Sequence, residues 1–352
     1  MDAKRSSVAD DLLDWYDGHR RVLPWRAAAG EVADPYRVWL LEVMLQQTTV
    51  ATVRPRFLAW VARWPTFADL AAADEGEVMA AWAGLGYYAR ARNLVAAAKA
   101  VVADHGGVFP RTEAELRRLP GFGAYTAAAV AAIAFGKRAV VIDANVERVV
   151  ARLFAIATPL PVARPSIRAA ADTITPESRA GDFAQATMDL GATICTPRGP
   201  RCLLCPLREH CLAFAQGEPE RLPVKAVKRA RPRRFGTVFW LQRAGEVLLV
   251  RRPAKGLLGG MRALPTGPWG DAPPGLEDAP AAGTGWRMLD ARVQHGFTHF
   301  DLDLALAAAH AGAHSVAVLG EWWPIAELES AGLPTLFAKA ARAAMGKAEE
   351  QA

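Results

Sequence analysis

The segment Cys195-Thr-Pro-Arg-Gly-Pro-Arg-Cys-Leu-Leu-Cys-Pro-Leu-Arg-Glu-His-Cys211 contains every cysteine of this 352-residue chain, at a spacing of C-x6-C-x2-C-x5-C. Four thiolates so close in sequence can surround one metal centre, and no further cysteine remains for a disulfide. Structural zinc is one candidate, but zinc sites usually pair two C-x2-C turns and this segment has one. The outer spacings favour an iron–sulfur cluster held by Cys195, Cys202, Cys205 and Cys211.

Length and composition predict about two domains and a reducing compartment. A chain of 352 residues exceeds the usual size of one domain and can bury a sizeable core. Apolar residues make up 52% of it, yet no run approaches the roughly 18 residues that a membrane span needs. The stretch from Met1 to Tyr16 is charged and lacks the apolar core of a secretory signal. We therefore expect a cytoplasmic, nucleoid-associated protein with no membrane partner.

The positive charge is concentrated in the N-terminal part of the chain. The net charge is +6, while residues 235–352 hold 10 Lys and Arg against 12 Asp and Glu, so the residues before them carry +8. A polyanionic partner would meet that part. Because an excess of arginine also serves solubility, charge alone does not single out nucleic acid.

Residues 8–215 show the pattern of an almost wholly helical domain. Asp34 and Pro35 are an N-cap and a first helical residue, and they open a helix predicted to run through Glu42 to Thr49. Thr112 and Glu115 form a capping box. The alanine-rich stretches 94–102 and 124–135 are strong helix formers whose small side chains let neighbouring helices approach closely.

A basic linker and a second domain follow. Residues 216–234 combine three prolines with seven Lys and Arg and almost no apolar periodicity, which predicts an interdomain linker. From Phe235 the hydrophobic period becomes two, which predicts strands at 235–241, 246–251 and 297–305, with a turn at 243–245 between the first two. A helix is expected over 334–345, so the second domain mixes helix and strand.

The stretch Leu119-Pro-Gly-Phe-Gly-Ala-Tyr-Thr126 joins two predicted helices through a Pro-Gly-x-Gly turn. Backbone N–H groups at the start of the second helix point outward there, so Gly121, Phe122 and Gly123 can bind a phosphate without a side chain. An ordinary corner between two helices, with glycines used for tight packing, explains the stretch equally well.

Glu42 is a candidate general acid. Its helical neighbours Val38, Trp39, Leu45 and Gln46 are mostly apolar. Burial among them disfavours the ionised form, so we expect a raised pKa and a proton available near neutral pH. A buried structural glutamate paired to an arginine is the alternative.

Asp143 begins a helix after an apolar run, where an N-cap is its simplest interpretation. Together with Glu42 it supplies the acid and the second carboxylate that cleave a glycosidic bond through an oxocarbenium-like transition state. The phosphate-binding hairpin and the arginine-rich linker indicate that the sugar belongs to a nucleic acid. A base-excision glycosylase is the resulting hypothesis.

Several segments, in order, resemble the MutY family of adenine DNA glycosylases, a branch of the helix-hairpin-helix superfamily with a [4Fe–4S] cluster. They are Leu23-Pro-Trp-Arg26, Glu42-Val-Met-Leu-Gln-Gln-Thr48, Gly84-Leu-Gly-Tyr-Tyr-Ala-Arg-Ala-Arg-Asn93, the 119–126 hairpin, Asp143-Ala-Asn145 and the four cysteines. The resemblance implies a mainly α glycosylase domain at 1–215 with the cluster loop at 195–211, a linker at 216–234 and a C-terminal α+β Nudix-like domain at 235–352. We also expect a structural monovalent or divalent cation at the hairpin.

Position 125 distinguishes this family from its sibling, endonuclease III, which shares the hairpin, the aspartate and the cysteine spacing. The sibling places a lysine there, whose amine forms a Schiff base with the abasic sugar. This chain has Tyr125, which cannot form one. The sibling also has an apolar residue at the position of Glu42 and no second domain of this size. The resemblance therefore implies a monofunctional glycosylase, an N-glycosyl hydrolase.

The resemblance also implies roles for individual residues. The residue at Glu42 protonates N7 of the extruded adenine and then serves the attacking water, and the residue at Asp143 stabilises the cationic sugar. Tyr125 and Asn145 support these two carboxylates. The predicted substrate contacts are Arg26 and Gln185 in the adenine pocket, Gln47 and Tyr87 as wedges in the duplex, and Trp25, Thr48 and Leu85. Simple packing is the alternative for both wedges, and the preferred interpretation of Tyr88.

The C-terminal domain resembles the lesion-recognition domain of the same family. The stretch 247–260 is similar to the start of an oxidised-nucleotide hydrolase, but the glutamate-rich REUxEE box that binds Mg²⁺ does not follow it. We therefore expect this domain to bind without hydrolysing. Thr298 and His299 lie where the family usually has Ser-His to read 8-oxoguanine, and the threonine keeps the hydroxyl while adding a methyl group.

The predicted function is the excision of adenine mispaired with 8-oxoguanine or guanine in duplex DNA by a monomeric enzyme whose cluster is structural. Three alternatives stay open. One is a pyrimidine-lesion glycosylase with lyase activity, which Tyr125 disfavours. Another is a catalytically silent iron–sulfur DNA-binding protein, and the third is a Nudix hydrolase with an appended DNA-binding part.

Overall fold

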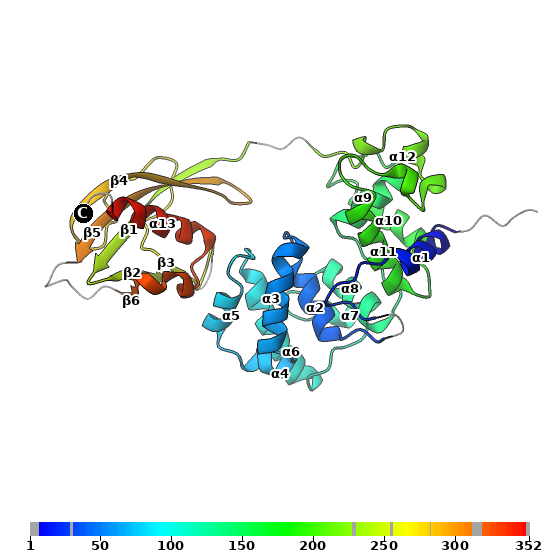
Figure 1. Cartoon of the computed structure of the whole chain (residues 1–352), viewed down its shortest axis with the longest axis horizontal. Coiled ribbons are helices and arrows are strands. Elements are labelled where there is room, and N and C mark those ends of the chain that lie inside the picture. Colours follow the sequence, from blue (N-terminus) through cyan, green and yellow to red (C-terminus); the bar gives the residue numbers. More distant parts are fainter. Residues whose placement is uncertain are drawn as a thin grey trace, which may run out of the picture. The chain divides into compact units, whose positions relative to one another are not determined.

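The computed structural model describes residues 7–28, 31–226, 230–253, 256–281, 283–311 and 319–349 (Figure 1). The chain divides into two compact units, one of Met1–Ala72 with Asn93–Lys228 and one of Ala73–Arg92 with Arg229–Ala352. The second unit thus includes a segment, 73–92, that the sequence assigned to the helical domain. The domain boundaries at 215 and 235 stay predictions, and residues 227–229 of the expected linker lie outside the described residues.

The first unit is helical, as expected. Its elements are α1 (Val8–His19), α2 (Pro35–Met44), α3 (Val50–Arg63), α4 (Phe67–Ala72), α7 (Glu113–Leu116), α8 (Ala124–Phe135), α9 (Ala144–Leu153), α10 (Arg164–Ile174), α11 (Ala180–Thr193), α12 (Leu212–Ala215) and the 3-10 turns η1 (Cys202–Leu204), η2 (Arg208–His210) and η3 (Pro219–Arg221). Helix α5 (Glu75–Ala81) lies in the segment 73–92, and α6 (Ala89–His105) begins there and continues into the first unit. None of the described helices has the length and hydropathy that crossing a bilayer requires.

Helix α2 ends earlier than the sequence predicted. Asp34 caps it, accepting hydrogen bonds from the amides of Tyr36 and Arg37, and Pro35 occupies the first turn. The predicted continuation to Thr49 was wrong, because Gln47 adopts a left-handed backbone (φ 58°) and Thr49 caps the next helix, α3. Gln47 and Thr48 therefore lie in a turn that follows α2.

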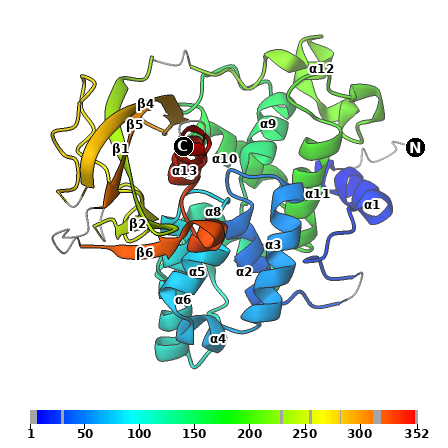
Figure 2. The ribbon, with the colours of Figure 1, turned by 60° about the vertical axis from the view of Figure 1, so that its left-hand side comes forward.

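Helix α8 lies within the helical unit and contacts α2, α7 and α11 (Figure 2). Its alanines are almost all buried, so its small side chains let these neighbours pack close to its backbone. The turn before it requires glycine at one position. Gly121 has a φ of 74°, and a Cβ built there would lie 2.5 Å from the Cβ of Asn93.

The second unit contains a mixed sheet and one long helix (Figure 1). The strands are β1 (Arg233–Arg243), β2 (Glu246–Arg251), β3 (Arg262–Ala263), β4 (Gly283–Gly296), β5 (Asp301–Ala311) and β6 (Glu321–Pro324), followed by η4 (Ile325–Ala331) and α13 (Thr335–Glu349). The order is β3-β2-β1-β5-β4, with β6 also paired to β2, and β1 runs parallel to β5. Helix α13 covers the sheet with Phe337, which is fully buried in the same core cluster as Val238 and Leu304. The α+β class is confirmed.

The predicted strand at 297–305 was wrong at its start. The strand begins at Asp301, and residues 297–300 form a turn between β4 and β5 that the Phe297 amide closes by donating to the carbonyl of Phe300 at 2.8 Å. The alternation of apolar residues extends across this turn because the rings of Phe297 and Phe300 both pack against the core cluster of the sheet. Thr298 and His299 consequently lie exposed at the tip of a turn.

We predict that Gly121→Ala destabilises the helical unit. The added methyl group meets Asn93, and the backbone stays in a region that alanine disfavours. The free energy of unfolding should fall by about 1–3 kcal/mol. Gly123→Ala is the matched control, because its Cβ meets nothing within 4 Å and its φ is −83°. Urea denaturation followed by circular dichroism measures both, and equal losses would contradict the argument.

Candidate active site

The helical unit contains a cavity of about 800 Å³ that gathers most of the predicted catalytic and substrate-binding residues. Helices α2, α8, α9 and α11 contribute to its wall together with the segment before α2 and the turn after it. The predicted residues that line it are Trp25, Arg26, Glu42, Gln47, Thr48, Tyr125, Asp143, Asn145 and Gln185. Residues far apart in the sequence thus meet in one concave site, which is the usual form of a small-ligand pocket.

Glu42 lies on the buried face of α2, with 5% of its surface exposed. The pKa of its carboxyl group is raised to about 7, chiefly by burial and in smaller part by the nearby Asp143 carboxylate. A hydrogen bond from the Tyr125 hydroxyl and the charge of Arg26 act in the opposite direction. The predicted rise in pKa is confirmed, so at neutral pH a large fraction of Glu42 carries a proton.

Tyr125 stands in the first turn of α8 and points its hydroxyl group at Glu42. Its O–H donates to the Glu42 Oε2. Burial raises the pKa of Tyr125 well above its ordinary value, and the charges of Glu42 and Asp143 raise it further. The phenol therefore stays protonated and acts as a hydrogen-bond donor at physiological pH.

Asp143 is the N-cap of α9, as predicted, and both of its carboxylate oxygens are held. Oδ1 accepts from the amides of Asn145 at 2.8 Å and Val146 at 2.7 Å. Oδ2 accepts from the side-chain amide of Asn145 at 2.9 Å. The capping role and a role in the cavity coexist, because the hydrogen bonds that cap the helix also orient the carboxylate toward the pocket that it lines.

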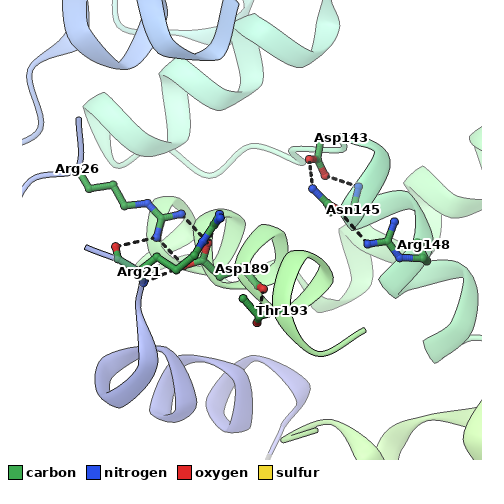
Figure 3. A network of polar contacts seen from close by, with 7 residues as sticks. All are labelled: Arg21, Arg26, Asp143, Asn145, Arg148, Asp189 and Thr193. Atoms are coloured by element: carbon green, nitrogen blue, oxygen red, sulfur yellow. Dashed lines mark hydrogen bonds and ion pairs between the residues drawn. The ribbon is translucent and has the colours of Figure 1, made fainter. Parts of the chain in front are cut away.

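Asn145 is itself fixed by a buried arginine that the sequence analysis did not single out (Figure 3). Arg148 Nη2 donates to Asn145 Oδ1 at 2.9 Å. It also donates to the carbonyl of Gly191 at 2.6 Å, and Nε donates to the carbonyl of Cys195 at 2.7 Å. A Cβ added at Gly191 would lie 2.6 Å from the Cβ of Asn145. Glycine at this position thus lets α11 approach the start of α9.

A second network orients Arg26 at the other side of the site (Figure 3). Arg26 donates from Nη1 to Asp189 Oδ2 at 2.5 Å and from Nη2 to Oδ1 at 2.8 Å, and Arg21 Nε donates to Oδ1 at 2.6 Å. Asp189 is completely buried. This aspartate was not predicted from the sequence, although its position four residues after Gln185, on the same face of the helix, was a usable signal.

The four cysteines gather at the end of α11, in η1 and at the start of α12. The pKa of the Cys205 thiol is raised to about 12, chiefly by burial and also by the other three thiols, so all four share one neighbourhood. The buried guanidinium of Arg152 donates to the sulfur of Cys195 at 3.3 Å and to the carbonyl of Thr196 at 2.8 Å.

A partly buried set of four thiols beside a cation suits an anionic thiolate-bound cluster. Within the residues that the structure describes, no three His, Cys, Asp or Glu side chains are placed to hold a single metal ion.

The remaining predicted residues lie outside the cavity. In the second unit, the hydroxyl of Tyr87 lies 3.3 Å from that of Thr298, and the neighbouring His299 is exposed. Leu85 is buried, with 4% exposure.

In the hairpin of the helical unit, Phe122 is buried while Gly121 and Gly123 are exposed. Helix α8 starts without a side-chain cap, which leaves its first amides available to an anion. The cation expected there stays a prediction.

Comparisons with known proteins show the family of this chain. The HhH-GPD superfamily of base excision DNA repair proteins matches residues 40–166, and the NUDIX domain family matches residues 237–343. The adenine DNA glycosylase of Mycolicibacterium smegmatis is 42% identical over 219 residues, which is 62% of this chain and 73% of that protein. The chain belongs to the adenine DNA glycosylase family.

Other members of the family are longer. The human adenine DNA glycosylase is 38% identical over 319 residues, which is 76% of this chain and 58% of that protein. The Arabidopsis thaliana protein is 42% identical over 295 residues and is matched over 46% of its length. The chain therefore spans about half of these relatives.

A thermostable thymine-DNA glycosylase of known structure, 31% identical with a TM-score of 0.53, matches 59% of this chain over 95% of its own length. The fold expected of an adenine DNA glycosylase, a helical helix-hairpin-helix part with a Nudix-like domain, is thus confirmed.

We predict that Asp189→Asn costs this adenine DNA glycosylase family member about 2–4 kcal/mol of unfolding free energy. The change leaves Arg21 and Arg26 without the carboxylate that compensates their partial burial. Asp182→Asn on the same helix is the control, because its ion pair with Arg179 is exposed and should cost less than about 1 kcal/mol. Chemical denaturation measures the unfolding free energy of both variants. A decrease in Asp189→Asn no larger than the decrease in Asp182→Asn would refute the prediction.

Proposed function

We propose that the chain is a monofunctional DNA glycosylase that hydrolyses the N-glycosidic bond of adenine paired with 8-oxoguanine or guanine in duplex DNA. The observation that carries this proposal is the buried Glu42, hydrogen-bonded by Tyr125 and with a pKa of about 7, in the same cavity as Asp143. An acid that is half protonated at neutral pH is suited to general acid catalysis. The family relationship supports adenine as the base.

The proposed reaction has two steps. Glu42 gives its proton to N7 of the extruded adenine, the C1′–N9 bond breaks, and its electron pair leaves with the base. The resulting oxocarbenium ion is stabilised by the Asp143 carboxylate, whose orientation its bonds to α9 fix. Water then attacks C1′ and returns a proton to the Glu42 carboxylate, so that the acid is regenerated.

The cavity is proposed to bind the adenine after it has left the helix. Arg26 and Gln185 line this cavity, and the ion pair with Asp189 keeps the guanidinium of Arg26 in one orientation. Extrusion of a base costs a few kcal/mol of stacking and pairing. A preformed pocket offsets part of that cost, because the groups that receive the base are ordered before it arrives.

Strand cleavage is not part of the proposed activity. A lyase of this superfamily needs an amine that attacks C1′, and Tyr125 offers a phenol that already donates to Glu42. The product is therefore an abasic site in an intact strand.

The four cysteines are proposed to hold a [4Fe–4S] cluster in a structural role. The cluster would keep the thiols deprotonated, and the basic residues of the same loop, Arg198, Arg201 and Arg208, would contact phosphates.

The C-terminal domain is proposed to read the base opposite adenine through Thr298 and His299, with Tyr87 entering the duplex. We further propose a cytoplasmic, nucleoid-associated monomer.

The decisive experiment is a single-turnover assay on a duplex with adenine opposite 8-oxoguanine, quenched with and without hot alkali. Strand breaks that appear only after alkali are expected. Glu42→Gln should slow base release more than about 100-fold while mispair binding is retained, because the amide has no proton to give. Glu177→Gln, a change at an exposed glutamate, is the control. Breaks without alkali, or no base release by the unmodified protein, would refute the proposed function.

We also predict that Tyr125→Phe moves the alkaline limb of the pH–rate profile to higher pH. The Tyr125 hydrogen bond lowers the pKa of Glu42, so its removal raises that pKa above about 7, and the acid form persists further into the alkaline range. Single-turnover rates from pH 5.5 to about 9 measure the shift.

Tyr36→Phe serves as the control for this profile. It removes another buried hydroxyl, one that donates to the carbonyl of Trp64 at 2.7 Å and does not line the cavity. Its alkaline limb should stay where it is in the unmodified protein. A limb that moves to lower pH in Tyr125→Phe would contradict the assignment of Glu42 as the acid.

A further inference from the structure

The turn that presents Tyr87 has an unusual backbone. Gly84 and Gly86 have φ values of 86° and 68°, and Tyr87 itself has a φ of 48°. A left-handed conformation is unfavourable for an aromatic residue and persists only where surrounding contacts impose it. The Tyr87 side chain is 53% exposed. An exposed ring on a strained turn is expected to need a specific support.

Arg90, in the first turn of α6, contacts both the backbone and the exposed ring of this turn. Its Nη2 donates to the carbonyls of Leu85 at 2.8 Å and Gly86 at 3.1 Å. Its guanidinium lies over the ring of Tyr87, 5.8 Å from the centroid, and over the ring of Trp82 at 5.1 Å. One planar group thus contacts both the backbone of the turn and the ring that the turn exposes.

Trp82 also supports the backbone of this turn. It is fully buried, and its indole N–H donates to the carbonyl of Gly86 at 2.9 Å. The Gly86 carbonyl therefore accepts from both Trp82 and Arg90. Because the indole is fixed in the core, the guanidinium that lies over it has a fixed position as well, and the position of the Tyr87 ring is determined through it.

The charge of Arg90 is retained in this environment. Burial lowers the pKa of Arg90 to about 10, which still leaves the guanidinium protonated near neutral pH. A charged, planar donor can bind two carbonyls at its edge while its face lies over aromatic rings. Lysine could supply the charge but not this combination of contacts.

We propose that Arg90 is a positioning residue that holds the Tyr87 ring ready to enter the duplex beside the mispaired adenine. This inference rests on the proposed function, in which Tyr87 is the wedge. Arg90 need not touch the DNA, because its effect passes through the orientation of the ring. It differs from a purely structural arginine in that its contribution to base extrusion should vanish when the Tyr87 ring is absent.

A double-mutant cycle tests this dependence. The full-length variants Arg90→Gln, Arg90→Lys, Tyr87→Ala and Arg90→Gln/Tyr87→Ala are compared in single-turnover release of adenine opposite 8-oxoguanine. Extrusion is followed separately by the fluorescence of a 2-aminopurine placed beside the target adenine, in a Glu42→Gln background that prevents base release. Arg63→Gln is the matched control, because it removes a guanidinium stacked on another tryptophan, Trp64, at 4.8 Å.

Arg90→Gln should lower the rate about tenfold and reduce the 2-aminopurine signal, since it removes two cation–π contacts and two charged hydrogen bonds. The rate and the 2-aminopurine signal of Arg90→Lys should lie between those of Arg90→Gln and those of the unmodified protein. The double variant should release adenine no more slowly than Tyr87→Ala alone. Arg63→Gln should release adenine at the rate of the unmodified protein.

Other outcomes overturn the inference. If the losses of Arg90→Gln and Tyr87→Ala multiply in the double variant, Arg90 acts independently of the ring. An Arg90→Gln variant with the rate and fluorescence of the unmodified protein would also refute it. If Arg90→Gln does not fold, Arg90→Lys with and without Tyr87→Ala carries the same comparison. Failure of the proposed function is distinguishable, because the unmodified protein would then release no adenine.

Discussion

The hydrogen bond between Tyr125 and Glu42 imposes the main physical constraint on the helical unit. The Glu42 carboxyl group is buried in the last turn of α2, where an unpaired polar group would be costly. The partner comes from the first turn of α8, so α2 and α8 must pack closely and in one register. The alanine-rich sequence of α8 permits that approach, because it places little side-chain volume between the two helices.

The second carboxylate depends on a different part of the fold. Asp143 is oriented by the start of α9, and Asn145, which contributes to that orientation, is held through Arg148 by carbonyl groups of Gly191 and Cys195. The cysteine-containing segment therefore contributes to the geometry of the cavity without lining it. The two carboxylates of the proposed reaction thus have separate supports, and their relative position reflects how α8, α9 and α11 pack together.

Much of this site could be predicted from local sequence. The caps at Asp34 and Asp143, the glycine turn before α8 and the raised pKa of Glu42 each follow from residues a few positions apart. The ion pairs of Arg21 and Arg26 with Asp189 could not be found in this way, because more than 160 residues separate the partners. The end of α2 at Met44 was also missed, since the left-handed backbone of Gln47 reflects tertiary packing and not a local breaker such as proline.

The pairing of Asp189 with two arginines has a consequence for the electrical balance of the cavity. Arg21 and Arg26 bring two positive charges, Asp189 and Asp143 bring two negative ones, and protonated Glu42 is neutral. In the proposed reaction the proton leaves with adenine, so the new Glu42 carboxylate and the sugar cation appear together and the sum stays at zero. Ionic strength should therefore act strongly on the encounter with a polyanion and hardly at all on the bond-breaking step.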